Sequence, residues 1–218
     1  MNNINTYIDH TLLDPLATLK DITKLCEEAR IYNFYSVCVH GCYVQKCREL
    51  LRDTEVDVCT VVGFPLGAVS TTVKVREAED AIDHGASEID MVINQGWVKD
   101  AEFHRILQEV HFVRDAIGGA TLKVIIETAN LNKQEIVEVS RIVVDGGADF
   151  VKTSTGFGSR GASLEDISII KNTIGHTAKI KASGGIRTYD DAVNFIRAGA
   201  ERIGTSSGVK IAGTFGKS

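Results

Sequence analysis

Two lysines stand inside short runs of apolar residues, Lys152 in Phe-Val-Lys-Thr-Ser and Lys181 in Lys-Ile-Lys-Ala-Ser. Lysine is rarely buried without a partner or a purpose. Each ammonium group either reaches solvent or pairs with a carboxylate such as Asp90 or Glu127. The alternative is chemical, because a second ammonium group and desolvation together lower the pKa of an amine enough to leave it neutral. A neutral amine attacks an aldehyde or ketone to form a Schiff base, which needs no metal ion as electron sink.

Asp90 is a carboxylate inside another apolar run, Glu-Ile-Asp-Met-Val. Glu88 precedes it by two positions and therefore lies on the same face of an extended strand. Asp90 would hold Lys152 or Lys181 in an ion pair, or would move protons between a substrate hydroxyl, a carbinolamine and water. The two roles are compatible, and the sequence does not separate them.

Glycines and hydroxyl residues follow three consecutive strands that the sequence predicts near its C-terminus. Backbone N–H groups and hydroxyls at such strand ends often bind phosphate. A turn alone explains any one of these glycines, but three such segments together favour a phosphate monoester ligand. The candidate residues are Thr155, Gly156, Gly184, Gly185, Ser206 and Ser207.

The elements that must position these residues alternate along the chain, short β-branched runs with longer segments of helical period. The predicted strands cover residues 7–10, 35–39, 58–63, 88–93, 122–127, 149–153, 179–182 and 202–205. The predicted helices cover residues 19–31, 43–52, 69–84, 101–117, 133–145, 164–174 and 189–198. Ser163 and Thr188, each followed by acidic residues, mark two of the helix starts.

Eight strand–helix units predict an α/β fold, a single-domain (β/α)8 TIM barrel over residues 1–218, and no linker divides the chain. The active site of such a barrel lies at the C-terminal ends of its strands, where Lys152, Lys181 and Asp90 fall. The runner-up is an open doubly wound sheet. Its Gly-rich turn after the first strand is missing, so a nicotinamide cofactor has little support.

Composition narrows the function classes. The chain has 44% hydrophobic and 24% charged residues and a formal net charge of −5, which indicates a globular protein without an electrostatic footprint for nucleic acid. The chain has no run of 18 apolar residues, which a membrane span would need, and its N-terminus shows no secretory signal. Five cysteines, an odd number, favour reduced thiols and a cytoplasmic protein.

The spacing of the potential ligands does not predict a metal site. Cys38, His40 and Cys42 have neither the Cys-x-x-Cys spacing of a zinc site nor a second pair of ligands downstream. The six histidines form no evident metal-binding set with the carboxylates. We therefore expect neither a metal nor another cofactor.

Two short motifs are discounted. Gly204-x-Ser206-x-Gly208 matches a serine nucleophile elbow, but no His or Asp follows to complete a triad. Gly216-Lys217-Ser218 resembles the end of a phosphate-binding P-loop, but Ile211 replaces its first glycine and no helix can follow.

Six segments carry a resemblance to one enzyme family and appear in the expected order along almost the whole chain. They are IDHTL at 8–12, VCTVVGFPLG at 58–67, EIDMV at 88–92, FVKTSTG at 150–156, KASGGIR at 181–187 and GTSS at 204–207. Together they resemble the deoxyribose-phosphate aldolases, the class I (Schiff-base) aldolases of deoxynucleoside breakdown.

The resemblance implies a barrel that reversibly cleaves 2-deoxy-D-ribose 5-phosphate into acetaldehyde and D-glyceraldehyde 3-phosphate. By the family's pattern, Lys152 forms the Schiff base, while Lys181 and Asp90 donate and accept protons. Asp9 and Cys38 match the wall of the family's pocket, and neither receives a direct chemical role. The partner is a small phosphorylated sugar, and a homodimer or homotetramer is compatible with the sequence.

The sequence departs from the family pattern at two places. Phe157 stands where some members have a lysine near the phosphate, so phosphate affinity here is expected to rest more on backbone N–H groups. Residues 213–218 lack the terminal tyrosine that in some members is thought to help protonate the enamine. The second departure affects the rate of that step and not the class of reaction.

Two rival functions share parts of this pattern. A sugar-phosphate isomerase or epimerase would use the same phosphate loops, but it typically needs carboxylate or metal chemistry. A non-catalytic sugar-phosphate sensor on a barrel scaffold would bind the ligand without turnover. The sensor predicts ligand binding that survives replacement of Lys152 by alanine, with no turnover in the parent protein.

Overall fold

A computed structural model describes residues 4–213, which fold into a closed barrel of eight parallel strands. Each strand pairs with the next in sequence, and the last, β8, pairs with β1. The strands are β1 (Ile8–Leu12), β2 (Ser36–Val39), β3 (Asp57–Val62), β4 (Glu88–Val92), β5 (Thr121–Ile125), β6 (Phe150–Lys152), β7 (Lys179–Ser183) and β8 (Arg202–Thr205). The predicted (β/α)8 barrel is confirmed, and the open sheet is excluded.

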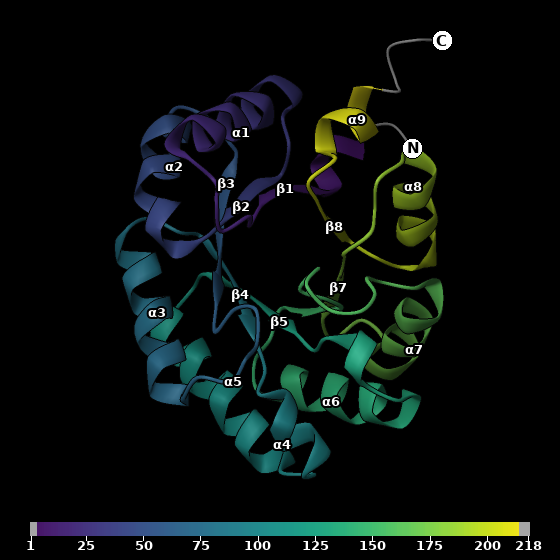
Figure 1. Cartoon of the computed structure of the whole chain (residues 1–218). Coiled ribbons are helices and arrows are strands. Elements are labelled where there is room, and N and C mark those ends of the chain that lie inside the picture. The colour runs from purple at the N-terminus through teal and green to yellow at the C-terminus, as the bar shows by residue number, and fades with distance from the viewer. Residues whose placement is uncertain (1–3, 214–218) are drawn as a thin grey trace.

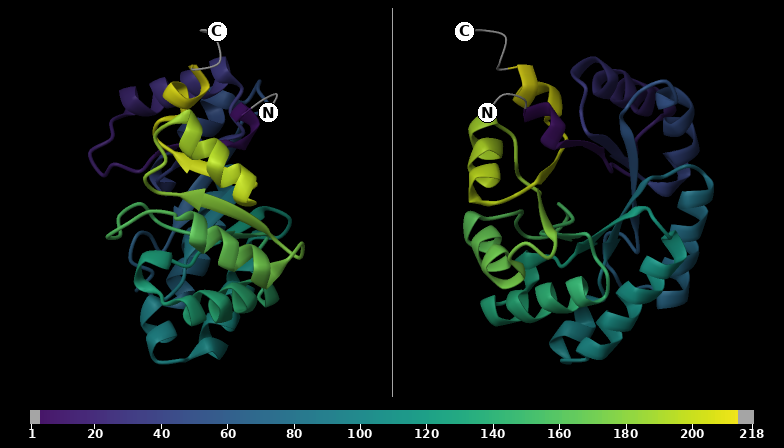
Figure 2. Two further views of the ribbon diagram at one scale, coloured as in Figure 1. Left: turned by 90° about the vertical axis from the view of Figure 1, so that its right-hand side faces the viewer. Right: turned by 180° about the vertical axis from the view of Figure 1, so that it is seen from behind.

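Helices surround the closed sheet and cover its outer face (Figure 1 and Figure 2). They are α1 (Leu19–Tyr32), α2 (Val44–Leu51), α3 (Thr71–Asp83), α4 (Gln95–Lys99), α5 (Phe103–Ile117), α6 (Lys133–Asp145), α7 (Leu164–Ile174), α8 (Tyr189–Ala198) and α9 (Gly208–Ala212). The sequence did not predict α4 and α9, because five residues are too few to show a helical period. Among the described residues, no helix is long and apolar enough to cross a membrane.

The helix starts predicted at Ser163 and Thr188 are confirmed as capping boxes. The Ser163 side chain accepts a hydrogen bond from the backbone N–H of Asp166, and the Asp166 carboxylate accepts one from the backbone N–H of Ser163. Thr188 and Asp191 repeat this arrangement at the start of α8. Each box satisfies N–H groups that a helix start leaves without a partner.

Strand boundaries differ from the prediction by a few residues. Tyr7, predicted to open the first strand, belongs to a 3-10 helix over Ile4–Tyr7, and β1 continues to Leu12. The fifth strand was predicted to reach Glu127 but ends at Ile125. Glu127 has a left-handed backbone with φ of 53°, which a strand does not accommodate.

The two faces of the barrel wall bury different types of side chain, because successive strand residues point to opposite sides. A large apolar core lies between wall and helices and includes Ile89, Met91 and Val124. The alternate positions point into the barrel and carry charges, among them Glu88 and Asp90. Apolar packing between the strands and the helices thus stabilises the fold, and polar side chains occupy the barrel interior.

Candidate active site

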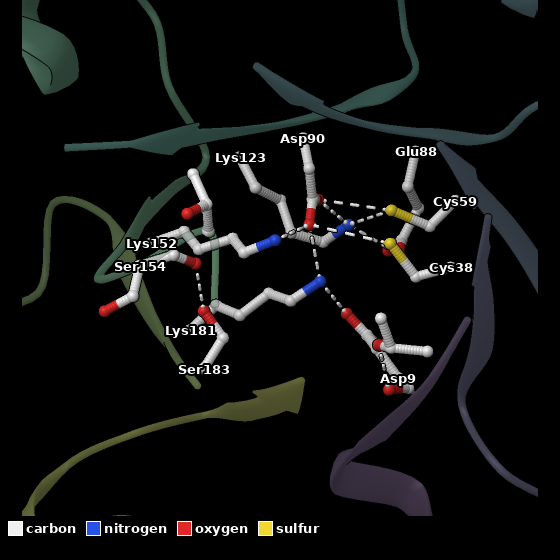
Figure 3. A network of polar contacts seen from close by, with 12 residues as sticks. Asp9, Cys38, Cys59, Glu88, Asp90, Lys123, Lys152, Ser154, Lys181 and Ser183 are labelled. Atoms are coloured by element: carbon white, nitrogen blue, oxygen red, sulfur yellow. Dashed lines mark hydrogen bonds and ion pairs between the residues drawn. The ribbon is translucent and has the colours of Figure 1, made fainter. Parts of the chain in front are cut away.

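Lys152 and Lys181 are direct partners in the register between β6 and β7, so both side chains enter the barrel at one level. Lys152 Nζ lies 2.7 Å from Oδ2 of Asp90, and Lys181 Nζ lies 2.6 Å from the same oxygen. Figure 3 shows the two chains reaching from one side toward this carboxylate. The structure therefore brings together the three residues for which the sequence predicted chemistry.

A third lysine, which the sequence analysis missed, holds the other oxygen of Asp90. Lys123 Nζ lies 3.0 Å from Oδ1 of Asp90 and 2.7 Å from Glu88, and its side chain is completely buried. The thiol of Cys59 also donates to Oδ1, at 3.2 Å. The available signal was Lys123 itself, a charged residue within the predicted strand 122–127.

Behind these groups, ion pairs extend across the barrel to β1 and β8. Asp9 contacts Lys181 at 2.5 Å and Arg202 at 2.7 Å. Arg202 also makes two hydrogen bonds of 3.1 Å to Glu88. Asp9 is therefore a partner of Lys181 beneath the cavity, and the sequence analysis gave no role to Arg202 or Glu88.

The ion pairs fix the charge states of two residues in this network, Asp90 and Lys181. Burial alone would raise the pKa of Asp90, but Lys123, Lys152 and Lys181 outweigh it and hold that pKa well below its usual value. Burial opposes the ammonium group of Lys181, yet Asp9 and Asp90 raise its pKa above the usual value. At neutral pH, Asp90 is thus a carboxylate and Lys181 an ammonium group.

A cavity of about 570 Å³ opens above this network at the C-terminal ends of the strands. Lys152 lines it, whereas Lys181, Asp90, Asp9 and Cys38 lie below the lining. Of the predicted phosphate-binding residues, all but Ser207 line the cavity: Thr155, Gly156, Gly184, Gly185 and Ser206. A substrate in the cavity would therefore meet the amine of Lys152 before any other member of the network.

The predicted phosphate end of the cavity is built from closely packed backbone. Gly184 has φ of +83°, and a Cβ there would lie 2.9 Å from the Cα of Gly161, so a side chain has no room. Gly156 and Gly185 also have positive φ. The exposed Arg187 lines the same cavity and was missed as a candidate, although it closes the segment KASGGIR.

Glu127 anchors the loop that contributes Thr155 and Phe157 to the cavity. Its Oε2 accepts hydrogen bonds from the backbone N–H and the hydroxyl of Thr155. The same hydroxyl accepts from the backbone N–H of Phe157 at 3.0 Å. The left-handed backbone at Glu127 is a strained conformation for a residue with a side chain, and such strain is typical of functional sites.

Aromatic rings lie at one side of the cavity. Phe157 lines it and meets Phe64, from the loop after β3, edge to face with ring centroids 5.4 Å apart. The ring at position 157 therefore offers an apolar surface where a lysine would offer a cation. Residues 214–218, which include the segment without the family's terminal tyrosine and the discounted Gly-Lys-Ser motif, lie outside the described residues.

Cys38, Cys59 and Asp90 are the one group of three side chains in the described part of the chain that could hold a metal ion. The ammonium groups of Lys123, Lys152 and Lys181 already contact Asp90. A divalent cation at this place would add charge where cations already crowd. The arrangement suits ammonium groups better than a metal ion.

Comparison with known proteins finds deoxyribose-phosphate aldolases among the relatives of this chain. The sequence profile of the DeoC/LacD family aldolase matches residues 4–213. A deoxyribose-phosphate aldolase of Carboxydothermus hydrogenoformans is 51% identical over 208 residues, which are 94% of this chain and 91% of that protein. Deoxyribose-phosphate aldolase 1 of Staphylococcus aureus is 52% identical over 205 residues, 94% of this chain and 93% of that protein.

Solved structures agree with the sequence relatives. The deoxyribose phosphate aldolase of Aeropyrum pernix, described as a unique tetrameric structure, superposes with a TM-score of 0.91 at 34% identity. The match covers 98% of this chain and 91% of that one.

Proposed function

Since this chain belongs to the DeoC/LacD family and is an aldolase, we propose that it cleaves 2-deoxy-D-ribose 5-phosphate reversibly through a Schiff base on Lys152. The contact that carries the proposal is the shared oxygen, Oδ2 of Asp90, between Lys152 and Lys181. Of these three residues, only Lys152 lines the cavity. The nucleophile, the cation and the carboxylate thus have separate places.

In the proposed mechanism, Nζ of Lys152 attacks C1 of the open-chain sugar, and the carbinolamine loses water to give an iminium ion. The C2–C3 bond breaks, its electron pair forms the C1–C2 double bond of an enamine, and a base takes the proton of the 3-hydroxyl group. Glyceraldehyde 3-phosphate leaves. The enamine is then protonated at C2, and water releases acetaldehyde and restores the amine.

Lys181 and Asp90 have complementary parts in this scheme. Their neighbours hold Lys181 as an ammonium group and Asp90 as a carboxylate, so Lys181 supplies a proton and Asp90 accepts one. Both are completely buried, so they reach the reacting atoms through Lys152 or through a water molecule in the cavity.

The phosphate group fits the end of the cavity formed by Gly156, Gly184, Gly185 and Ser206. Arg187 adds a cation there, which compensates for the phenyl ring of Phe157. Ser207 lies one residue beyond the lining, and its backbone N–H donates to the hydroxyl of Thr205 at 2.9 Å, so a phosphate contact would have to come from its side chain. This lining favours a sugar phosphate over a free sugar as the substrate.

The experiment that tests this function is reductive trapping with acetaldehyde and borohydride, followed by intact mass and peptide mapping. A reduced two-carbon adduct on Lys152 supports the proposal. The matched control is Lys179, an exposed lysine on the same strand as Lys181, which should carry no adduct. An adduct on Lys181 alone would keep the reaction class and reverse the roles, whereas no adduct would contradict the Schiff base.

Assembly and location belong to the same proposal. The tetrameric relative from Aeropyrum pernix supports a homo-oligomer of two or four chains, which light scattering of the purified protein would test. The five cysteines support the cytoplasm, since reduced thiols persist there.

A further inference from the structure

Asp90 divides its two oxygens between different partners. Oδ2 contacts Lys152, which lines the cavity, and Lys181. Oδ1 is held by Lys123 at 3.0 Å and by the thiol of Cys59 at 3.2 Å (Figure 3). Lys123 does not line the cavity, so it cannot touch a substrate there. Any effect of Lys123 on the reaction must pass through Asp90.

The network below the cavity contains more cationic side chains than carboxylates. Its carboxylates are Asp9, Glu88 and Asp90, and its cationic side chains are Lys123, Lys152, Lys181 and Arg202. All seven are buried, so solvent screens them little. With every basic group protonated, one positive charge has no counterpart, and loss of one proton balances the network.

The contacts indicate which group loses that proton. Lys123 contacts Glu88 and Asp90, and Lys181 contacts Asp9 and Asp90. Arg202 contacts Asp9 and Glu88. Lys152 contacts one carboxylate, Asp90, and shares its oxygen with Lys181. The surplus charge is therefore least stabilised on Lys152.

The remaining side chains that face Lys152 and Asp90 are two thiols and two hydroxyls, and the hydrogen bond with Cys59 lowers the pKa of the Cys38 thiol below its usual value. Cys38 on β2 donates to Oδ2 of Asp90 at 4.0 Å, and Cys59 approaches from β3. Burial raises the pKa of the Cys59 thiol well above its usual value, so that group stays neutral. Ser154 and Ser183, at the ends of β6 and β7, are uncharged hydroxyls joined to each other through the Ser154 carbonyl.

Resting on the proposed function, we propose that Lys123 is a positioning residue: it fixes Oδ1 of Asp90, and its charge, with those of Lys181 and Arg202, balances the three carboxylates and so keeps the amine of Lys152 neutral for attack on the aldehyde. Removal of the Lys123 charge leaves as many carboxylates as cations and frees Asp90 to hold Lys152 as ammonium. Removal of the Glu88 charge does the opposite, because it enlarges the cationic surplus.

Two variants with opposite predicted signs test this role, Lys123→Met and Glu88→Gln. The measurement is the rate of reductive trapping of acetaldehyde on Lys152, by peptide mapping, as a function of pH. Lys123→Met should move the acidic limb of this profile to higher pH by about one unit, and Glu88→Gln should move it to lower pH by a similar amount. Lys179→Met, which removes an exposed lysine, is the matched control and should not move it.

The outcomes separate this inference from the proposed function. Lack of an adduct on Lys152 in the parent protein contradicts both. If the parent forms the adduct on Lys152 but the acidic limb of the pH profile does not move in folded Lys123→Met and Glu88→Gln, only the role of Lys123 is contradicted. Slower trapping with an unchanged acidic limb indicates structural damage alone. If Lys123→Met does not fold, Glu88→Gln decides alone: a limb moved to lower pH supports the inference, and any other result overturns it.

Discussion

Lys152 and Lys181 face each other across one step of the β6–β7 register, yet only Lys152 reaches the cavity. Lys181 ends between Asp9 and Asp90, with contacts of 2.5 and 2.6 Å, and is fully buried. Two lysines that look alike in the sequence thus have different surroundings, one at the cavity and one enclosed between two carboxylates.

This difference predicts distinct losses for the two lysines. Lys152→Met should abolish both turnover and adduct formation, because it removes the lysine that lines the cavity. Lys181→Met should retain an adduct on Lys152 but lower kcat by about a hundredfold or more, since a proton donor and the neighbouring charge are lost. Steady-state kinetics and peptide mapping give the comparison, and near-parent turnover of Lys181→Met at pH 7 would contradict its role.

Arg187 should contribute to affinity for the phosphate and not to the chemical step. We expect Arg187→Met to raise KM for deoxyribose 5-phosphate by about tenfold, as befits the loss of one charge-assisted contact, with little change for unphosphorylated deoxyribose. Arg197→Met is the matched control, because Arg197 is exposed on α8 away from the cavity lining. Equal effects on both sugars would remove the phosphate assignment from this end of the cavity.

Glu127 should act through the loop that it holds. Glu127→Ala removes the acceptor of both hydrogen bonds from Thr155, so KM for the phosphorylated sugar should rise by about tenfold. Glu127→Gln keeps an acceptor oxygen at this place and should recover most of the affinity. If the alanine and glutamine variants behave alike in kinetic assays, hydrogen bonding to Thr155 is not the cause.

The pair of Lys74 and Glu109 lies outside the barrel, between α3 and α5, and both side chains are completely buried 2.8 Å apart. Lys74 also donates to the carbonyl oxygen of Val92, next to the strand end that carries Asp90. Lys74→Met should lower the free energy of unfolding by about 3 kcal/mol, because Glu109 would remain buried without its partner. Urea unfolding measures this loss.

A double-mutant cycle with Lys74→Met and Glu109→Leu separates the pair from its other contacts. The double variant should be more stable than Lys74→Met alone, since no buried charge remains. It should stay below the parent protein, because the backbone groups of Val92 and Asn94 lose their partners. Losses that simply add would contradict a direct interaction.

Acid should remove the stabilising effect of Asp9. Burial favours its protonated form, but Lys181 and Arg202 outweigh burial and hold the pKa of Asp9 below its usual value of 3.8. A carboxylate with a lowered pKa stabilises the fold above pH 3.8 and loses this effect as pH falls through its value in the folded protein. Asp9→Asn should therefore be less stable than the parent at pH 7 by about 3 kcal/mol, and the difference should shrink below pH 3.8.

Urea midpoints across this pH range provide the measurement for Asp9. Asp53→Asn is the control, since Asp53 is exposed and pairs with its neighbour Arg52 at the surface. That variant should differ little from the parent at any pH. A constant difference between Asp9→Asn and the parent from pH 7 to pH 3 would show that charge on Asp9 does not contribute.

The strands, the helices and their order along the chain could be predicted from the sequence, because apolar runs and helix caps are local signals. Ser163 and Thr188 mark helix starts whatever the rest of the chain does. The lysines at 152 and 181 were noticeable because a charge inside an apolar run is costly without a partner. The same signal at Lys123 was overlooked, although it stands inside a predicted strand.

Only the tertiary structure decided which charges meet. Asp9 and Arg202 are 193 residues apart in sequence and 2.7 Å apart in space, because closure of the barrel pairs β8 with β1. Local sequence carries no information on such a contact, since the register of eight strands sets the height and direction of each side chain. The sequence by itself determined the barrel and the types of its chemical groups. Barrel closure determined that, of the buried lysines in residues 4–213, Lys152 alone opens onto the cavity.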